Sequence, residues 1–443
     1  MASMSVSDRT YNEIRFPESR PVGADVVMLC IGAVLLMLKS HRILYVRFIS
    51  DAVIYPFALV CFIVYIAYNY RKLERFTIFK AFCALILTVI FFYDYMLVHA
   101  AQYTLISFLR IGTIILGSVL LLQAPLDDKS TVYRSFKVTV EVIVLIGLSG
   151  WIPFLCGVDL PHYQDTKDRF YMHQIYYVFN TFAINSAADL YRFCGPFLEP
   201  GHLGTMSAFL LYIDGFNLKR FGNIILFVAI IMSLSLAAYG LMVGGVILVL
   251  FQKKNWFALI AMVGIFIGLG IGAAAWLNGD NVLNRAIVSR LEVTEDGEIA
   301  GNNRTTGFFD ASYDKYLRSD KTLLGVGRDA FGSQSDSSDN ITMGTAGYKR
   351  YFYLRGIIGS VLIMAFILIY SFRYRSWRSF GFLIVYLVAN FIRDYPTKEI
   401  WMYLFIMAMP LLQDRQWNPW KKNKDLTVTA SPGEVRSGAD TGV

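Results

Sequence analysis

The segment from Arg192 to Gly204 combines ionisable side chains with turn residues just before an apolar run. Arg192, Glu199 and His202 lie within eleven positions, and glycines and prolines set the path of the backbone between them. A guanidinium can hold an anion, while a carboxylate or an imidazole can accept a proton. The segment therefore predicts a site for an anionic ligand. Under the alternative interpretation, glycine and proline only shape the start of a helix while Arg192 reaches lipid headgroups.

A second polar segment, 278 to 352, carries further candidate residues. Asn302 or Asn303 could cap a helix whose apolar face would include Phe309, Tyr313, Tyr316 and Leu317, and Arg304 would stand at its positive end. An arginine there is poor for helix stability but suits a phosphate, because free N–H groups and the guanidinium point at one anion. Asp310 on the same helix joins Glu199 and His202 as a candidate general base.

Two shorter motifs follow in the same segment. Residues 324 to 327 read Leu-Gly-Val-Gly before Arg328, which is too short and lacks the preceding strand of a nucleotide-binding fingerprint. Residues 348 to 355 place Lys349, Arg350 and Arg355 among aromatic side chains that include Tyr348. This cationic and aromatic group predicts either anchoring to lipid headgroups or a second phosphate-binding site.

Composition and hydropathy identify the elements that must position these residues. The chain has 443 residues, of which 56% are hydrophobic and 17% charged, and many apolar runs are long enough to cross a bilayer. We therefore expect an all-α polytopic membrane protein with about eleven or twelve spans. The net charge of +8 falls mostly in short loops, so no nucleic-acid partner is expected.

The positive-inside rule gives the topology. Lysines and arginines recur in alternate short loops, which places both termini in the cytoplasm and two long loops outside. The predicted spans are about 22–38, 49–70, 76–99, 103–123, 138–157, 200–218, 222–238, 240–252, 255–277, 353–372, 379–393 and 400–412. The chain accordingly divides into N-terminal spans 1–157, a first large loop 158–199, central spans 200–277, a second large loop 278–352, C-terminal spans 353–412 and a disordered tail 413–443.

Charged side chains inside the spans are energetically costly unless they are paired or line a water-filled cavity. Asp94 and Arg110 fall at similar depths on consecutive spans and predict an ion pair, either as a structural clamp or as a substrate contact involving Arg110. Glu141 and Asp214 lie near span ends, where they can reach water. An aromatic-rich stretch at 170–179 should lie along the membrane interface.

Cysteine and acidic patterns bear on cofactors. Five cysteines form no Cys-x-x-Cys or Cys/His cluster. Cys156 and Cys194 both lie near the outer face and could pair, but two separate thiols are the favoured interpretation. Asp336 and Asp339 are embedded in serines and read as a linker rather than as a cation site. No metal and no cofactor are expected.

Several motifs, taken together, resemble the Wzy-type O-antigen and capsule polymerases, which are related to the O-antigen ligases. They are Arg192-x-x-Gly195, Phe197-x-Glu199-Pro-Gly, Arg304 in the long outer loop, Leu324-Gly-Val-Gly, and Tyr348 ahead of Gly356-Ile-Ile-Gly. The resemblance covers about residues 180 to 365. It implies a GT-C-like helical fold in a bacterial inner membrane that polymerises undecaprenyl-diphosphate-linked oligosaccharide at the periplasmic face. It also implies membrane lipids, a flippase and a chain-length regulator as partners.

The sequence departs from the ligase branch of this superfamily. Ligases carry a histidine just before the final glycine-rich re-entry, where this chain has Gly344-Thr-Ala-Gly-Tyr348. That difference favours a polymerase, with a ligase as the nearer alternative. In the polymerase, arginines at the lipid diphosphate would stabilise the charge of the leaving group, and Arg192 and Arg304 are the candidates. A transporter of lipid-linked saccharide is a further alternative, but its usual two similar halves are absent from this sequence.

Overall fold

The computed structural model describes most of the apolar chain. The described residues are 23–40, 49–70, 77–98, 104–165, 174–177, 182–185, 191–197, 199–276, 280–282, 284–289, 307–327 and 347–413. Arg304, Arg328, the linker at 336–339 and the tail after 413 lie outside this part of the chain, so the predictions that concern them remain predictions.

The described chain is overwhelmingly helical, with thirteen α-helices and one small sheet. Each predicted span overlaps a helix, but the boundaries differ, and the helix at the predicted span 138–157 begins twelve residues earlier, at Leu126. The helices are α1 (Ala24–Ser40), α3 (Asp51–Asn69), α4 (Ile78–Val98), α5 (Leu105–Gln123), α6 (Leu126–Leu155), α7 (Pro200–Ile213), α8 (Phe221–Ser233), α9 (Leu236–Gln252), α10 (Trp256–Ala275), α11 (Gly307–Leu317), α13 (Gly347–Arg373), α14 (Trp377–Ile392) and α15 (Glu399–Gln413).

Within the described residues, five helices are long and apolar enough to cross a membrane, namely α3, α4, α5, α6 and α13. Four shorter apolar helices, α8, α9, α14 and α15, accompany them. By length and composition, the chain is a multi-pass membrane protein. Exposed apolar side chains on α3, α4 and α5, such as Phe57, Leu85 and Phe108, fit a lipid-facing surface rather than a watery one.

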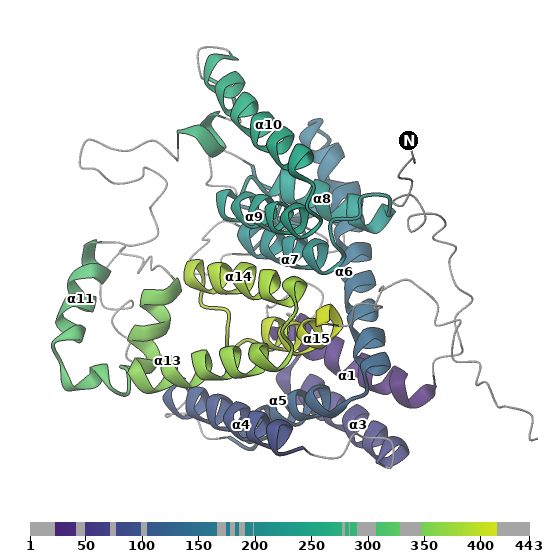
Figure 1. Ribbon diagram of the computed structural model, residues 1–443, viewed down its shortest axis with the longest axis vertical. Helices are drawn as coiled ribbons and strands as arrows, with labels where there is room; N and C mark the ends of the chain where they lie inside the picture. Colours follow the sequence, from purple (N-terminus) through teal and green to yellow (C-terminus); the bar gives the residue numbers. More distant parts are fainter. Residues whose placement is uncertain are drawn as a thin grey trace, which may run out of the picture.

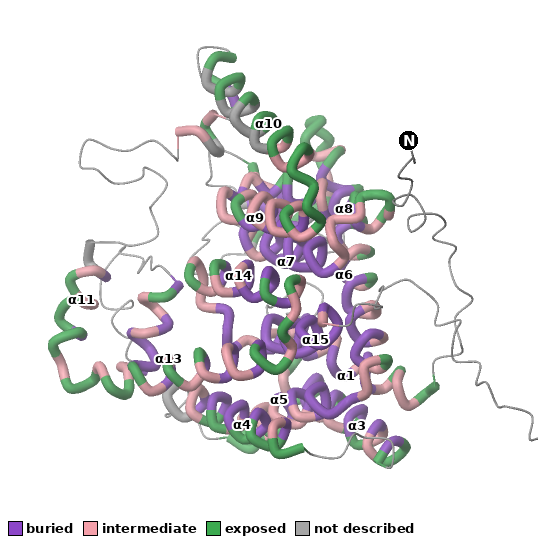
Figure 2. The backbone as a smooth tube through the Cα atoms, in the orientation of Figure 1, coloured by how far each residue is buried: buried purple, intermediate pink, exposed green. Residues whose placement is uncertain are grey.

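The core surrounds α15, whose residues from Glu399 to Leu412 are all buried. This helix packs against α1, α5, α6 and α14 and lies in the middle of the bundle (Figure 1). Its burial appears as a continuous purple stretch in Figure 2. A helix that is apolar all round must be enclosed by its neighbours, which explains its central position.

The first large loop contains a three-stranded antiparallel sheet that the sequence did not predict. Strands β1 (His162–Asp165), β2 (Gln174–Tyr177) and β3 (Phe182–Asn185) pair in the order β1-β2-β3. Phe182 of β3 packs edge-on against Trp151 of α6, with ring centroids 5.8 Å apart. A side chain at Gly150 would meet the Phe182 ring at 2.5 Å, so glycine there lets the strand approach the helix. The sheet is thereby fastened to the end of α6.

Helix α13 begins before the predicted span and is broken inside. Gly356 has φ 64° and ψ −167°, a backbone conformation that favours glycine, and it separates a short first arm from the longer apolar arm. Helix α11 stands at the edge of the molecule beside the first arm (Figure 1).

The helix predicted near Asn302 forms, and its described part runs from Gly307 to Leu317. Phe309 and Tyr316 are buried as predicted, whereas Leu317 is 45% exposed and does not share their face.

Candidate functional site

The turn between α14 and α15 brings together residues from distant parts of the chain. Arg393 in this turn forms an ion pair with Glu199, the residue that precedes α7. Its Nη1 also lies 3.2 Å from His202 Nε2 on the first turn of α7. Glu199 and His202, predicted from the sequence as neighbours in one site, thus share one guanidinium that the sequence did not single out.

Two glycines make room for Arg393. A Cβ atom at Gly201 would lie 2.4 Å from Arg393 Nη2, and one at Gly347 would lie 2.3 Å from the Arg393 backbone. Either contact would force the arginine or its helix to move, since real Cβ atoms do not approach so closely. Glycine at these positions lets the starts of α7 and α13 close around the α14–α15 turn.

Arg393 contacts one of the two ring nitrogens of His202. A guanidinium can only donate a hydrogen bond, so His202 Nε2 is the acceptor in this contact. His202 Nε2 is 3.9 Å from Glu199 Oε2, and the imidazole lies beside Tyr395, with ring centroids 5.6 Å apart. The Glu199 carboxylate and the His202 imidazole, two groups that can accept a proton, are therefore held side by side.

Arg355 occupies the centre of a second polar group next to this turn. Its Nε pairs with Asp94 of α4, its Nη1 lies 3.3 Å from both oxygens of Asp394, and its Nη2 donates to Thr397 Oγ1 at 3.0 Å. The guanidinium also stacks over the Tyr351 ring at 4.4 Å. Two carboxylates and one ring thus compensate a side chain that is only 7% exposed.

Asp394 stays ionised despite its enclosure. Burial alone would raise the pKa of its carboxyl, but Arg355, together with Arg350 and Lys398, outweighs burial and holds the pKa below the ordinary value. At this turn, cations and carboxylates from α4, from α13 and from the turn itself therefore balance one another.

The motif at 324–327 docks onto the break in α13. Val326 N donates to Tyr353 O at 3.0 Å and Gly327 N donates to Leu354 O at 3.2 Å, which are carbonyls that an unbroken helix would satisfy itself. In return Ile358 N donates to Leu323 O at 3.2 Å. The break therefore leaves these backbone groups satisfied, as a membrane protein requires.

The same crossing explains the glycines of that motif. Gly325 has φ 88°, and a Cβ atom there would lie 2.3 Å from Leu354 O. The Tyr93 hydroxyl of α4 donates to Leu324 O at 2.8 Å and lies 3.1 Å from Arg355 O. The motif therefore lies across the break in α13 and is joined to it by backbone hydrogen bonds.

Helix α11 is tied to the first arm of α13. Lys349 Nζ lies 2.7 Å from Asp310 Oδ1. Beneath this pair, Phe309 and Tyr316 pack with Tyr353 and Leu354 in a small core of their own. Asp310, predicted as a candidate general base, therefore has a lysine partner and lies 39% exposed.

Arg192 lies on the other side of the start of α7. Its Nε donates to Ser233 O at the end of α8, at 3.1 Å, and the adjacent Phe193 N donates to Met232 O. Two residues later Cys194 is buried, which raises the pKa of its thiol to about 12, while Arg192 lowers that pKa and Glu199 raises it.

The remaining predicted site residues lie in different surroundings. Tyr348 stacks on Phe391 with centroids 4.3 Å apart and planes 5° apart, and both rings are partly exposed at the end of α14. Arg350 is half-buried near Asp394. Arg110 does not pair with Asp94 as predicted. Its Nη1 lies 3.8 Å from Asp51 and its guanidinium lies over Tyr55, because Arg355 from α13 reaches Asp94 instead.

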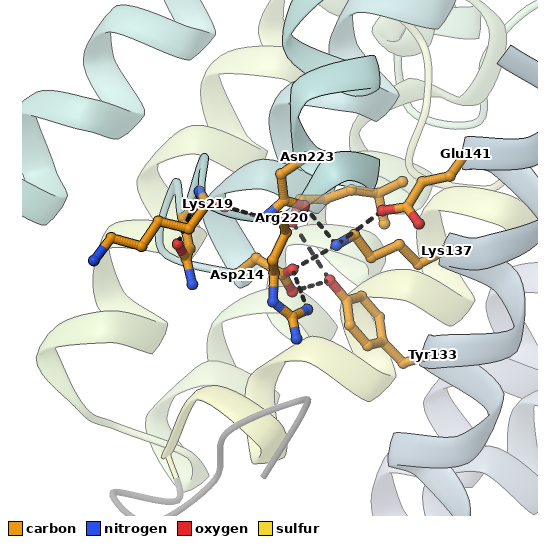
Figure 3. A network of polar contacts seen from close by, with 9 residues as sticks. Tyr133, Lys137, Glu141, Asp214, Lys219, Arg220 and Asn223 are labelled. Atoms are coloured by element: carbon orange, nitrogen blue, oxygen red, sulfur yellow. Dashed lines mark hydrogen bonds and ion pairs between the residues drawn. The ribbon is translucent and has the colours of Figure 1, made fainter. Parts of the chain in front are cut away.

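A third polar group corrects another expectation. Asp214 was expected to reach water, yet its side chain is 1% exposed and pairs with Lys137 of α6 (Figure 3). Tyr133 donates to Asp214 Oδ1 at 3.1 Å, and Lys137 also contacts Glu141 at 3.0 Å. Helix α6 begins at Leu126, twelve residues before the predicted span. It therefore includes Lys137, which reaches Asp214 in the α7–α8 turn. This group fastens α6 to that turn.

Cysteines and metal ligands can be assigned within the described residues. Cys156 is exposed and Cys194 buried, and both are free thiols, as expected. No group of three His, Cys, Asp or Glu side chains among the described residues is arranged to hold a metal ion.

The sequence reasoning missed Arg393 and Asp394. The signal was present, because Arg-Asp-Tyr-Pro-Thr-Lys-Glu at 393–399 is a dense run of charge in a short turn between apolar helices. Comparison of the chain with family models, with curated proteins and with solved structures found no match.

Proposed function

We propose that the protein is a glycosyltransferase that polymerises lipid-diphosphate-linked oligosaccharide at the outer face of a bacterial inner membrane. The observation that carries the proposal is the convergence of Glu199 and His202 on Arg393 at the start of α7. It provides proton acceptors beside cations within a membrane protein, which is what this reaction needs. The resemblance of the surrounding motifs to Wzy-type polymerases supplies the substrate class.

In the proposed reaction an acceptor hydroxyl attacks the anomeric carbon of the donor glycan. The new C–O bond forms as the bond from that carbon to the diphosphate oxygen breaks, the hydroxyl proton passes to Glu199, and undecaprenyl diphosphate leaves with the electron pair. Arg192 and Arg304 hold the diphosphate, where their charge stabilises the leaving group. Arg350 is the third candidate for this role.

Arg393 and Arg355 have different parts in the proposal. Arg393 positions Glu199 and keeps His202 neutral, so that the imidazole can pass the proton on. Arg355 is already matched by Asp94 and Asp394, and we assign it to positioning the α13 break rather than to binding diphosphate. In this proposal the positive charge that binds the diphosphate therefore comes from Arg192, Arg304 and Arg350 rather than from Arg355.

The test uses purified protein and defined lipid-linked repeat units, with products read by mass spectrometry. Glu199→Gln should slow chain extension about 10²- to 10⁴-fold, the usual effect of losing a general base. Arg393→Lys should lower the turnover number more than it raises KM, because it keeps the charge but loses the fork that orients Glu199. Asp159→Asn is the matched control, since that carboxylate is 96% exposed.

The outcomes separate the candidate functions. Wild-type rates in Glu199→Gln would remove this residue from the chemistry. Transfer of single units to an added lipid acceptor without extension would identify a ligase. Movement of the intact substrate across a vesicle membrane without any new glycosidic bond would identify a transporter.

A further inference from the structure

Two aromatic rings stack on each other at the surface beside the α14–α15 turn. Tyr348, on the first turn of α13, lies against Phe391 at the end of α14, with ring centroids 4.3 Å apart and ring planes 5° apart. Tyr348 is 40% exposed and Phe391 is 60% exposed. The two rings therefore hold each other in place and still leave ring surface accessible to a ligand.

This ring pair adjoins the proposed proton acceptor. Phe391 precedes Arg393 by two positions, so their Cα atoms lie at most about 7 Å apart. Gly347 precedes Tyr348, and a Cβ atom at Gly347 would overlap the backbone of Arg393. The beginning of α13 and the end of α14 accordingly lie side by side (Figure 1). Because Arg393 pairs with Glu199, one turn holds both the rings and the carboxylate.

Hydrogen-bonding groups stand beside the rings. Lys349 follows Tyr348 on α13, and its Nζ lies 2.7 Å from Asp310 Oδ1 of α11 and 5.7 Å from the centre of the Tyr313 ring. The side chains of Lys349 and Asp310 are 24% and 39% exposed. An ammonium group has three hydrogens to donate and a carboxylate has about four acceptor positions, and their mutual contact uses one of each. The pair therefore retains donors and acceptors for a ligand.

This combination of groups suits a sugar ring. The C–H groups on one face of a pyranose pack against the negative face of an aromatic ring, and its hydroxyls both donate and accept hydrogen bonds. A carboxylate next to an ammonium group serves both roles. A phosphate group would instead be repelled by Asp310, which also offsets the charge of Lys349. A lipid tail would cover the rings but would make no use of the polar pair.

We propose that Tyr348 and Phe391 form the surface on which the acceptor glycan rests, and that Asp310 and Lys349 hydrogen-bond to its hydroxyls. This assignment rests on the proposed transferase function and names the part of the site that binds sugar. The predicted topology places both helix ends on the outer side, where the acceptor is presented. A glycan held on the rings has its reacting end near Glu199.

The test measures binding of a free oligosaccharide to the full-length protein in neutral detergent. The probe is the repeat unit released by mild acid from the surface polysaccharide of the host, and isothermal titration gives its affinity. Phe391→Ala and Tyr348→Ala should each weaken binding about fivefold or more, the worth of one ring stacked on a ligand, while Phe391→Trp should retain it. Phe380→Ala is the matched control, because Phe380 is a 52% exposed phenylalanine about 16 Å away along the same helix.

The transfer assay provides a second measurement. The two alanine variants should raise the KM for the acceptor several-fold and leave the turnover number nearly unchanged, because the rings do not touch the reacting atoms. No oligosaccharide binding by wild-type protein, equal affinity in wild type and both alanine variants, or a lower turnover number at unchanged KM would overturn the assignment, even with transfer intact. Ring-dependent oligosaccharide binding without any transfer by wild-type protein would instead refute the proposed function and leave the glycan-binding surface standing.

Two further measurements separate sugar binding from folding and from membrane anchoring. Phe391→Leu keeps an apolar side chain but removes the ring, so it should retain the helicity of the wild type and still weaken oligosaccharide binding. Wild-type affinity in this variant would overturn the assignment. Alanine variants that lose their hold on liposomes but bind the oligosaccharide as wild type does would identify the rings as membrane anchors, which would overturn it as well.

Discussion

Replacement of Arg355 by methionine should destabilise the protein by about 3–5 kcal/mol, the range for breaking a buried ion pair from one side. Arg355 is 7% exposed, and the Asp94 and Asp394 side chains are 23% and 15% exposed. Methionine preserves the volume of the aliphatic stem but leaves two carboxylates facing each other without their cation. Like charges at such positions repel in a medium where water screens them poorly.

A double-mutant cycle isolates this effect. Asp394→Asn alone should cost about 1.5–3 kcal/mol, the value of a hydrogen bond to a charged group. The double variant should cost at least about 1 kcal/mol less than the sum of the single variants, because it removes one of the carboxylates that Arg355→Met leaves uncompensated. The free energy of unfolding can be measured by titrating micelle-solubilised protein with sodium dodecyl sulphate and following helicity. Strict additivity, or a cost below about 1 kcal/mol for Arg355→Met, would refute the compensation argument.

Three further predictions follow from the contacts described. Gly356→Ala should cost about 1–3 kcal/mol in backbone strain and more from overlap with Leu323 O, 2.5 Å from the added Cβ, whereas Gly240→Ala, with nothing within 4 Å, should not lower the melting temperature. Because the pKa of Asp394 is lower in the folded protein than its ordinary value of 3.8, the ionised carboxylate should stabilise the protein at pH values above 3.8. This stabilisation should be lost as the pH falls through the pKa of Asp394 in the folded protein. Asp394→Asn should therefore flatten that part of the profile of unfolding free energy against pH. Arg192→Ala should abolish long glycans while Arg192→Lys restores them in part, and full activity of the alanine variant would contradict its role at the diphosphate.

The glycines around positions 325 and 356 show what a local sequence pattern can indicate about local structure. Glycines recur in Leu324-Gly-Val-Gly and at Gly356, and the structure places Gly325 and Gly356 where two segments cross at backbone distance. The crossing itself joins residues about thirty positions apart and satisfies carbonyls freed by a broken helix. Nothing in the local pattern specifies which segment supplies those hydrogen bonds.

Ion pairing was the least predictable feature. Asp94 and Arg110 were matched from depth on consecutive helices, but Asp94 pairs with Arg355 from a helix more than two hundred residues later. Depth along a helix follows from sequence, whereas the direction of a side chain and the identity of the facing helix follow from packing. Asp214 was misplaced for the same reason, because the lysine that encloses it comes from α6.

The sequence by itself determined that the chain is helical and spans a membrane, because the lengths of its apolar runs and the need to satisfy every backbone group in lipid leave few other solutions. It also marked Glu199 and His202 as neighbours, since they lie one turn apart at the start of a helix. Only the tertiary structure decided that Arg393 joins them and that Arg355 is matched by two carboxylates. Those contacts depend on which helix ends meet, and that is set by the burial of α15 and the close packing of helices around it rather than by any local pattern.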